Sequence, residues 1–191
     1  MAFVGVQHQN GEPATLDKLR LISEMAEAWA VESEAFGEFV LAVVQRAGAG
    51  SSAAEQVCAW ADFCESLPYR REAEEKFRSP VLTAQKGGDC DDLTILALAG
   101  FRSLGLQCYP ECFAPPAGNG FHVRARVGLP PLEPTRWLVV DPVWKSEREW
   151  ATKGLIQVPC NHRPAKASLW PVALSFLAGF GVAKLLTWRR T

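Results

Sequence analysis

The chain has 191 residues, of which 48% are hydrophobic, and its formal net charge at pH 7 is −1. This length is enough to bury one core of ordinary size, so we expect one compact domain with additions at its ends. The charge is close to zero, and no arginine-rich stripe is interleaved with aromatic residues. We therefore predict no nucleic-acid partner.

The N-terminal quarter is predicted to be helical after a short extended lead over residues 1–14. Between Thr15 and Arg46, apolar residues recur at steps of three and four, which is the spacing of one helix face, and Gly37 is where this region could divide in two. We expect most of these side chains in the core, and a stripe that binds a partner protein is the alternative. The apolar residues of this face are Leu16, Leu19, Ile22, Met25, Trp29, Phe36, Phe39, Val40 and Val43.

A second amphipathic helix is predicted over Ala53–Leu67, after a linker formed by Gly48–Ser52. The following segment, Pro68–Lys86, is rich in charged residues. We interpret it as an irregular connection in which Arg78–Pro80 forms a turn.

The run Gly87–Asp92 contains a cysteine placed like an enzyme nucleophile. From Asp91 to Leu104, apolar residues follow helical spacing, acidic residues occupy the first turn and Gly105 provides a stop. Cys90 therefore falls at or next to the N-cap, where unpaired N–H groups and the helix dipole favour the thiolate. The two glycines before it let the backbone turn sharply and leave room beside the sulfur.

Three aspartates flank this cysteine, and their negative charge opposes formation of the thiolate. The plain interpretation is that Asp91 and Asp92 satisfy the N-terminus of the helix, while Asp89 fixes the turn through its own backbone. None of the three needs a catalytic role.

A hairpin is predicted after this helix, because residues 121–127 alternate in hydrophobicity and residues 137–141 form a second short strand. The loop between them, Leu129–Thr135, contains three prolines. The midpoint of positions 122 and 141 falls inside this loop, so we expect His122 and Asp141 to be cross-strand partners with Cβ atoms roughly 5 Å apart. A cysteine at a helix start, followed by a histidine and an aspartate on successive strands, is the order of a thiol nucleophile, its base and the group that orients the base.

These motifs resemble the transglutaminase-like superfamily of papain-type thiol enzymes, and especially its small bacteriophage and bacterial members. The resemblance rests on Gly88–Asp92, Phe121–Val123 and Val140–Pro142, and it covers roughly residues 60–144. It implies an α+β fold with a papain-like core, in which N-terminal helices and a catalytic helix pack on a small antiparallel sheet.

The resemblance also implies roles for individual residues. Cys90 would be the nucleophile, His122 the general base and acid, and Asp141 the residue that orients the imidazole. The backbone N–H of Cys90 and the side chain of Gln85 would stabilise the oxyanion, without a cofactor or a metal ion.

The activity that we predict is hydrolysis of an amide or peptide bond through an acyl-enzyme, as in a cysteine peptidase or amidase. A protein or a cell-wall peptide is the expected substrate. The alternative is a non-catalytic structural or assembly protein that keeps the same scaffold.

The six cysteines do not suggest a disulfide framework, because the N-terminus lacks the features of a secretory signal peptide. We expect reduced thiols, in particular at Cys58 and Cys64. A zinc site formed by Cys108, Cys112, Cys160 and His162 is the alternative for the other cysteines, but the two pairs are far apart in the chain and separate thiols are favoured.

The C-terminal segment 169–188 carries a single charged residue, Lys184, and is followed by Arg189 and Arg190. As a helix it would be about 30 Å long, which matches the thickness of a bilayer core. We predict a membrane anchor, and the alternative is a hydrophobic helix buried in an assembly such as a virion.

These observations divide the chain into three parts. The first is an N-terminal lead and helical region (1–52), the second a transglutaminase-like core (53–160), and the third a basic linker with a hydrophobic C-terminal helix (161–191).

Overall fold

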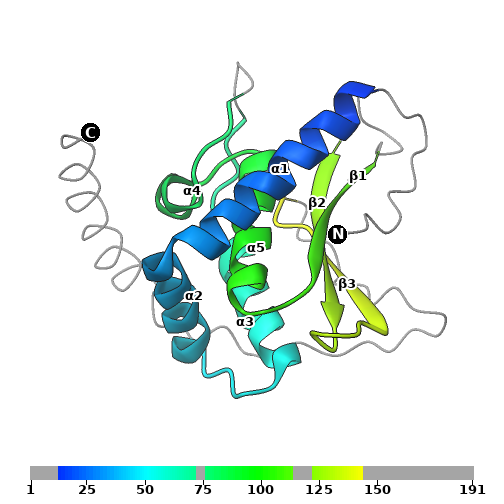
Figure 1. The fold of residues 1–191 in the computed structure, drawn as a ribbon. Coiled ribbons are helices and arrows are strands. Elements are labelled where there is room, and N and C mark those ends of the chain that lie inside the picture. Colours follow the sequence, from blue (N-terminus) through cyan, green and yellow to red (C-terminus); the bar gives the residue numbers. More distant parts are fainter. Residues whose placement is uncertain (1–12, 72–75, 114–121, 144–191) are drawn as a thin grey trace.

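The computed structural model describes residues 13–71, 76–113 and 122–143 (Figure 1). These residues form five helices and one three-stranded antiparallel sheet, so the fold is α+β, as predicted. The elements are α1 (Pro13–Glu32), α2 (Glu34–Arg46), α3 (Ala53–Ser66), α4 (Pro80–Lys86), α5 (Cys90–Ser103), β1 (Cys108–Phe113), β2 (His122–Leu129) and β3 (Arg136–Val140).

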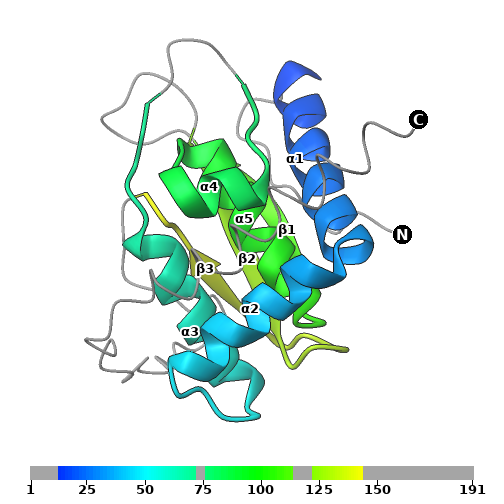
Figure 2. The ribbon, with the colours of Figure 1, turned by 90° about the vertical axis from the view of Figure 1, so that its left-hand side faces the viewer.

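Helix α5 lies at the centre of the molecule, between the other helices and the sheet (Figures 1 and 2). Its residues from Asp91 to Phe101 are all buried, which is typical of a helix packed on every side. It contacts β1 and β2 of the sheet, whose strand order is β1-β2-β3. Helix α1 crosses α5 and also contacts β1, while α2, α3 and α4 pack against α5. The start of α5 is therefore fixed by packing along the whole helix.

The apolar core contains a cluster of aromatic rings around Trp60. Its ring makes edge-to-face contacts with Phe36 and Phe39 and stacks on Phe63 with the centroids 5.1 Å apart. The indole Nε1–H donates a hydrogen bond to the carbonyl of Ala97 on α5, at 3.1 Å. The indole therefore buries its polar atom with a partner, and it joins α3 to the central helix.

Gly100 lets Trp60 lie flat against α5, because a Cβ atom at this position would overlap the indole ring. We therefore expect Gly100→Ala to lower the free energy of unfolding by about 1–3 kcal/mol through overpacking. Gly37 on α2 provides a matched control, since a Cβ there meets no atom within 4 Å. Gly37→Ala should raise stability by about 0.5–1 kcal/mol, because alanine is the better helix former. Urea denaturation of both variants checks this, and equal effects would contradict the packing.

The predicted helical region of residues 15–46 is confirmed, but its division point is Ser33 and not Gly37. The Oγ of Ser33 accepts a hydrogen bond from the backbone N–H of Phe36 at 3.3 Å, so the serine caps α2. An N-cap has its own non-helical backbone, which separates the two helices more strongly than a glycine does. Most of the predicted core residues are buried, whereas Leu16 is 45% exposed.

Helix α4 was not predicted, because Ser79 and Pro80 were interpreted as part of a turn. Ser79 is the N-cap of this helix, and its Oγ accepts a hydrogen bond from the N–H of Leu82 at 3.3 Å. Pro80 occupies the first turn, where a missing N–H has no cost. Serine followed by proline is a helix start signal, but seven residues are too few to show helical periodicity.

The described cysteines differ in whether they form a disulfide bond. Cys64, Cys90, Cys108 and Cys112 are not disulfide-bonded, as expected. Cys58 is disulfide-bonded, so the expectation of a reduced thiol is wrong for this residue. Signal-peptide features were a poor guide here, because bond formation depends on whether two sulfurs lie within reach of each other.

The predicted hydrophobic C-terminal helix, 169–188, lies outside the described residues. Among residues 13–71, 76–113 and 122–143, no helix has the length and the apolar character needed to span a membrane.

Candidate active site

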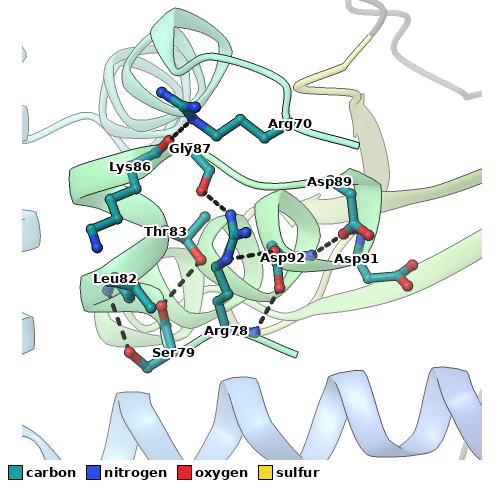
Figure 3. A network of polar contacts seen from close by, with 10 residues as sticks. All are labelled: Arg70, Arg78, Ser79, Leu82, Thr83, Lys86, Gly87, Asp89, Asp91 and Asp92. Atoms are coloured by element: carbon teal, nitrogen blue, oxygen red, sulfur yellow. Dashed lines mark hydrogen bonds and ion pairs between the residues drawn. The ribbon is translucent and has the colours of Figure 1, made fainter. Parts of the chain in front are cut away.

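The nucleophile candidate Cys90 is the first residue of α5, as the sequence predicted. Asp89 is the N-cap, and its Oδ1 accepts hydrogen bonds from the backbone N–H groups of Asp91 at 3.1 Å and Asp92 at 3.2 Å (Figure 3). Asp89 therefore fixes the turn, but with its side chain and not through its own backbone. The interpretation that Asp91 and Asp92 satisfy the N-terminus of the helix is wrong, because the Asp89 carboxylate is the cap. Asp91 and Asp92 contribute backbone donors to this cap, and their side chains have other partners.

The two glycines before the nucleophile are needed for close packing. Gly87 has φ of 74°, and a Cβ atom on it would overlap the carbonyl oxygen of Pro68. A Cβ atom on Gly88 would overlap the side chain of Asp92. The sequence indicated room beside the sulfur as the reason for the glycines. The structure shows that the room is used by Pro68 and by the Asp92 side chain.

Two arginines hold the carbonyl groups of this turn, and we call Arg70 and Arg78 the arginine clamp (Figure 3). The Arg70 Nε–H donates to the carbonyl of Lys86, and the Arg70 backbone N–H donates to the carbonyl of Gly88 at 2.8 Å. The Nη1 of Arg78 donates to the carbonyl of Gly87 at 3.0 Å. Three successive carbonyl oxygens are thus bound by the clamp, which fixes the backbone that leads into Cys90.

The clamp is anchored to α5 through Asp92, whose side chain is fully buried. The backbone N–H of Arg78 donates to Oδ1 of Asp92 at 2.7 Å, and the Nε of Arg78 lies 3.9 Å from Oδ2. A buried carboxylate with a cationic partner holds its neighbours strongly, because losing that partner is costly. The role of Asp92 is therefore to fix the nucleophile turn.

Asp91 pairs with a lysine of α1 and with the thiol itself. The Nζ of Lys18 lies 2.6 Å from Oδ2 of Asp91, and the Cys90 thiol donates to Oδ1 at 3.6 Å. The thiol, the carboxylate and the ammonium group form a short chain that links α1 to the nucleophile.

His122 and Asp141 are in direct contact and are almost completely buried. The His122 Nε2 lies 2.8 Å from the Oδ2 of Asp141, with 7% of the histidine side chain and 0% of the aspartate side chain exposed. The Oδ1 of Asp141 accepts a hydrogen bond from the backbone N–H of Val143 at 3.1 Å. The predicted contact of a histidine held by a carboxylate is therefore present.

The predicted register of the hairpin is wrong by two residues. Ala125 pairs with Val140, so the continued register brings Asp141 opposite Arg124 and not opposite His122. Side chains alternate across a strand, so a shift of two keeps both residues on one face. His122 and Asp141 therefore form a diagonal pair across the two strands, and this separation is within reach of side chains of their length.

Cys90 lies beside the start of β2, next to the residue that follows His122. The Cys90 sulfur accepts a hydrogen bond from the backbone N–H of Val123, the residue after His122. The Oγ1 of Thr94, one turn further along α5, donates to the carbonyl of Val123 at 3.1 Å. Both contacts attach the beginning of α5 to Val123, the strand residue next to His122.

The local electrostatics keep the thiol protonated at neutral pH. Burial of the Cys90 sulfur, followed by the negative charge of Asp91, raises the pKa of the thiol to about 12. Asp89 acts in the same direction, whereas the Val123 N–H and the charge of Lys18 lower the pKa. The prediction that the flanking aspartates oppose the thiolate agrees with this balance.

A pair of substitutions tests this balance through reaction of Cys90 with iodoacetamide, because the thiolate is the reacting form. Asp91→Asn should accelerate alkylation at about pH 9, since it removes a charge that raises the pKa of Cys90. Lys18→Met should slow it, since Lys18 lowers that pKa. A change of one pKa unit alters the thiolate fraction about tenfold in this range. Peptide mapping resolves Cys90 from the other thiols, and effects of the same sign would contradict the chain of contacts.

Gln85, the predicted oxyanion donor, is half-buried on α4, and its role stays a prediction.

Sequence reasoning missed Tyr69. This residue forms a parallel bridge with Gly88, and charge on Cys90 contributes to raising the pKa of its phenol. Nothing in its sequence context marked it, because it stands in a charged segment without periodicity.

The described residues contain no group of three or more cysteine, histidine, aspartate or glutamate side chains placed to hold a metal ion. Cys108 and Cys112 are the first and fifth residues of β1, and they pair with Val127 and Val123 of β2. The other two members of the alternative zinc set, Cys160 and His162, lie outside the described residues.

No family model, curated protein or solved structure was found to match the chain.

Proposed function

We propose that the protein is a thiol enzyme of the transglutaminase-like type, which cleaves an amide or peptide bond through an acyl-enzyme. The observation that carries this proposal is the buried contact of His122 with Asp141, next to the strand residue whose N–H meets the Cys90 sulfur. A helix start, a histidine and an orienting carboxylate are the parts that thiol-based acyl transfer requires.

The geometry indicates how the proton would move. The Nε2–H of His122 donates to Asp141, so Nδ1 would be the nitrogen that takes the proton from the Cys90 thiol. The sulfur attacks the carbonyl carbon, and the backbone N–H groups at the start of α5 stabilise the oxyanion. His122 then gives its proton to the leaving amine, and a thioester remains on Cys90. A water molecule, deprotonated by His122, hydrolyses this thioester and releases the acid.

The raised pKa of Cys90 favours one version of this mechanism. A thiol with a pKa of about 12 is protonated at neutral pH, so the resting state would be a neutral thiol and not a thiolate–imidazolium pair. His122 would then act as a general base during attack, which is the way a serine nucleophile is activated.

The proposal also includes a papain-like core and a location for the protein. A central helix that begins at the nucleophile and packs on an antiparallel sheet supports a transglutaminase-like fold. The apolar segment 169–188 would attach the protein to a membrane or within a virion. A phage or bacterial protein of this kind would act on a structural protein or on a cell-wall peptide.

The second candidate function is a structural or assembly module without catalysis. Two observations on Cys90 favour it. The thiol donates a hydrogen bond to Asp91, and its pKa is raised. In this case the contacts of Cys90 would only stabilise the packing of α5 on β2.

Acylation of Cys90 by p-nitrophenyl acetate distinguishes the two functions. An enzyme should form an acetyl thioester on Cys90 and then hydrolyse it, so that p-nitrophenol is released over many turnovers. Cys90→Ala, which keeps the other thiols, is the control and should abolish this turnover. Release that is equal in wild type and Cys90→Ala would contradict the enzyme and leave the structural module.

A further inference from the structure

We propose that Tyr69 is a further catalytic residue, whose phenol O–H donates to the oxyanion that forms when Cys90 is acylated. This inference rests on the proposed thiol chemistry and adds a side-chain donor that is not Gln85. It follows from how the chain around Tyr69 is attached to the nucleophile turn.

The segment Pro68–Arg70 is fixed against that turn by backbone contacts. Tyr69 and Gly88 form a parallel bridge, in which the N–H of Arg70 donates to the carbonyl of Gly88 at 2.8 Å. The carbonyl of Pro68 lies so close to Gly87 that no side chain fits there. The guanidinium of Arg70 binds the carbonyl of Lys86 as well (Figure 3). Tyr69 is therefore held opposite Gly88, which lies two residues before Cys90 in the chain. The contacts that hold it come from Pro68 and Arg70, the residues on its two sides.

The side chain of Tyr69 is available to a substrate. It is 49% exposed, although the segment that carries it is attached to the core. A large aromatic side chain on a fixed backbone loses little conformational freedom when it contacts a ligand. Such a residue is suited to direct contact with the reacting group.

Electrostatics keep this phenol in the donor form close to the nucleophile. Burial of its inner part, then the charges of Cys90 and Asp89, raise the pKa of the Tyr69 phenol above its ordinary value of 10.0. The phenol thus remains protonated at neutral pH and can act as a donor. A neutral O–H can donate to a developing oxyanion without being deprotonated by it.

The arginine clamp directs N–H groups of both guanidinium groups to the turn itself. The Nε–H of Arg70 and the Nη1–H of Arg78 are bound to carbonyl groups of the turn. The backbone N–H of Cys90 supplies one oxyanion donor, as proposed above. Tyr69, whose backbone forms the parallel bridge with Gly88, is the residue that we assign as the side-chain donor to the same oxygen.

Two reactions of the Cys90 sulfur distinguish an oxyanion donor from a residue that affects the thiol itself or the fold. Acylation by p-nitrophenyl acetate creates an oxyanion, whereas alkylation by iodoacetamide at carbon does not. Tyr69→Phe removes only the hydroxyl group, so the fold should persist. We expect the acylation rate constant of Cys90 to fall roughly 10²-fold, which is the effect of losing one oxyanion donor, and the alkylation rate to stay within about twofold.

Tyr109→Phe is the matched control, because Tyr109 is the other tyrosine of the chain and its ring pairs with Trp137 at 5.0 Å. It should leave both reactions unchanged. An unchanged acylation rate in Tyr69→Phe would overturn the inference, and so would an equal loss in both reactions, which would show an effect on the thiol or the fold. If wild-type Cys90 is not acylated at all, the proposed function fails together with this inference, and that result differs from both others.

Discussion

Replacing His122 by alanine is expected to lower the rate constant for acylation of Cys90 by about 10²–10⁴-fold, the range found for general acid–base catalysis. The reason is the raised pKa of the thiol. At neutral pH almost no thiolate forms without a base, and the imidazole held by Asp141 is the base that lies next to the strand contact of Cys90. The rate is measured by the increase of the acetylated mass of Cys90 with time.

Asp141→Asn provides the matched control for this substitution. The amide keeps the size of the side chain but accepts less strongly from Nε2–H, so the imidazole is oriented less well and its protonated form is less stabilised. We expect acylation slower than in wild type and faster than in His122→Ala. If His122→Ala acylated as fast as wild type, His122 would not be the base.

Trp60→Ala is expected to lower the free energy of unfolding by about 3–5 kcal/mol, the largest stability effect that we predict. Trp60 is completely buried, contacts Phe36, Phe39 and Phe63, and donates a hydrogen bond to α5. Its removal leaves a cavity between α3 and α5. Urea unfolding followed by circular dichroism measures the change.

Trp137→Ala is the control for the loss of an indole group. Trp137 is only partly buried, and its one described ring contact is with Tyr109. The expected loss is below about 1.5 kcal/mol, the upper range for a single aromatic pair. Equal losses in the two variants would contradict a core centred on Trp60.

The parts of the fold with regular periodicity were predicted well from the sequence. Helix α5, the strands β2 and β3 and the position of Cys90 at a helix start follow from apolar spacing and from Gly105 as a stop. The contact of His122 with Asp141 was predicted for a partly wrong reason. The observed pairing is centred one position beyond the midpoint of 122 and 141, and only the even size of the register error kept the two side chains on one face.

The remaining parts of the site depend on contacts between segments far apart in the sequence. Lys18 pairs with Asp91 across 73 positions, a distance over which periodicity carries no information. The arginine clamp binds backbone carbonyl groups, and any residue supplies those. Tyr69 approaches the nucleophile turn only because Gly87 admits the carbonyl of Pro68. The sequence thus indicates the candidate residues of the site, while the tertiary structure determines what orients them.

The most direct test of the mechanism is the pH dependence of Cys90 acylation in wild type and in His122→Ala. With His122 as general base, the wild-type rate constant should level off at a pH far below the pKa of about 12 of the thiol itself. In His122→Ala it should instead rise continuously with pH, following the thiolate. Two identical profiles that both rise towards high pH would contradict the mechanism, because Cys90 would then react as an ordinary buried thiol.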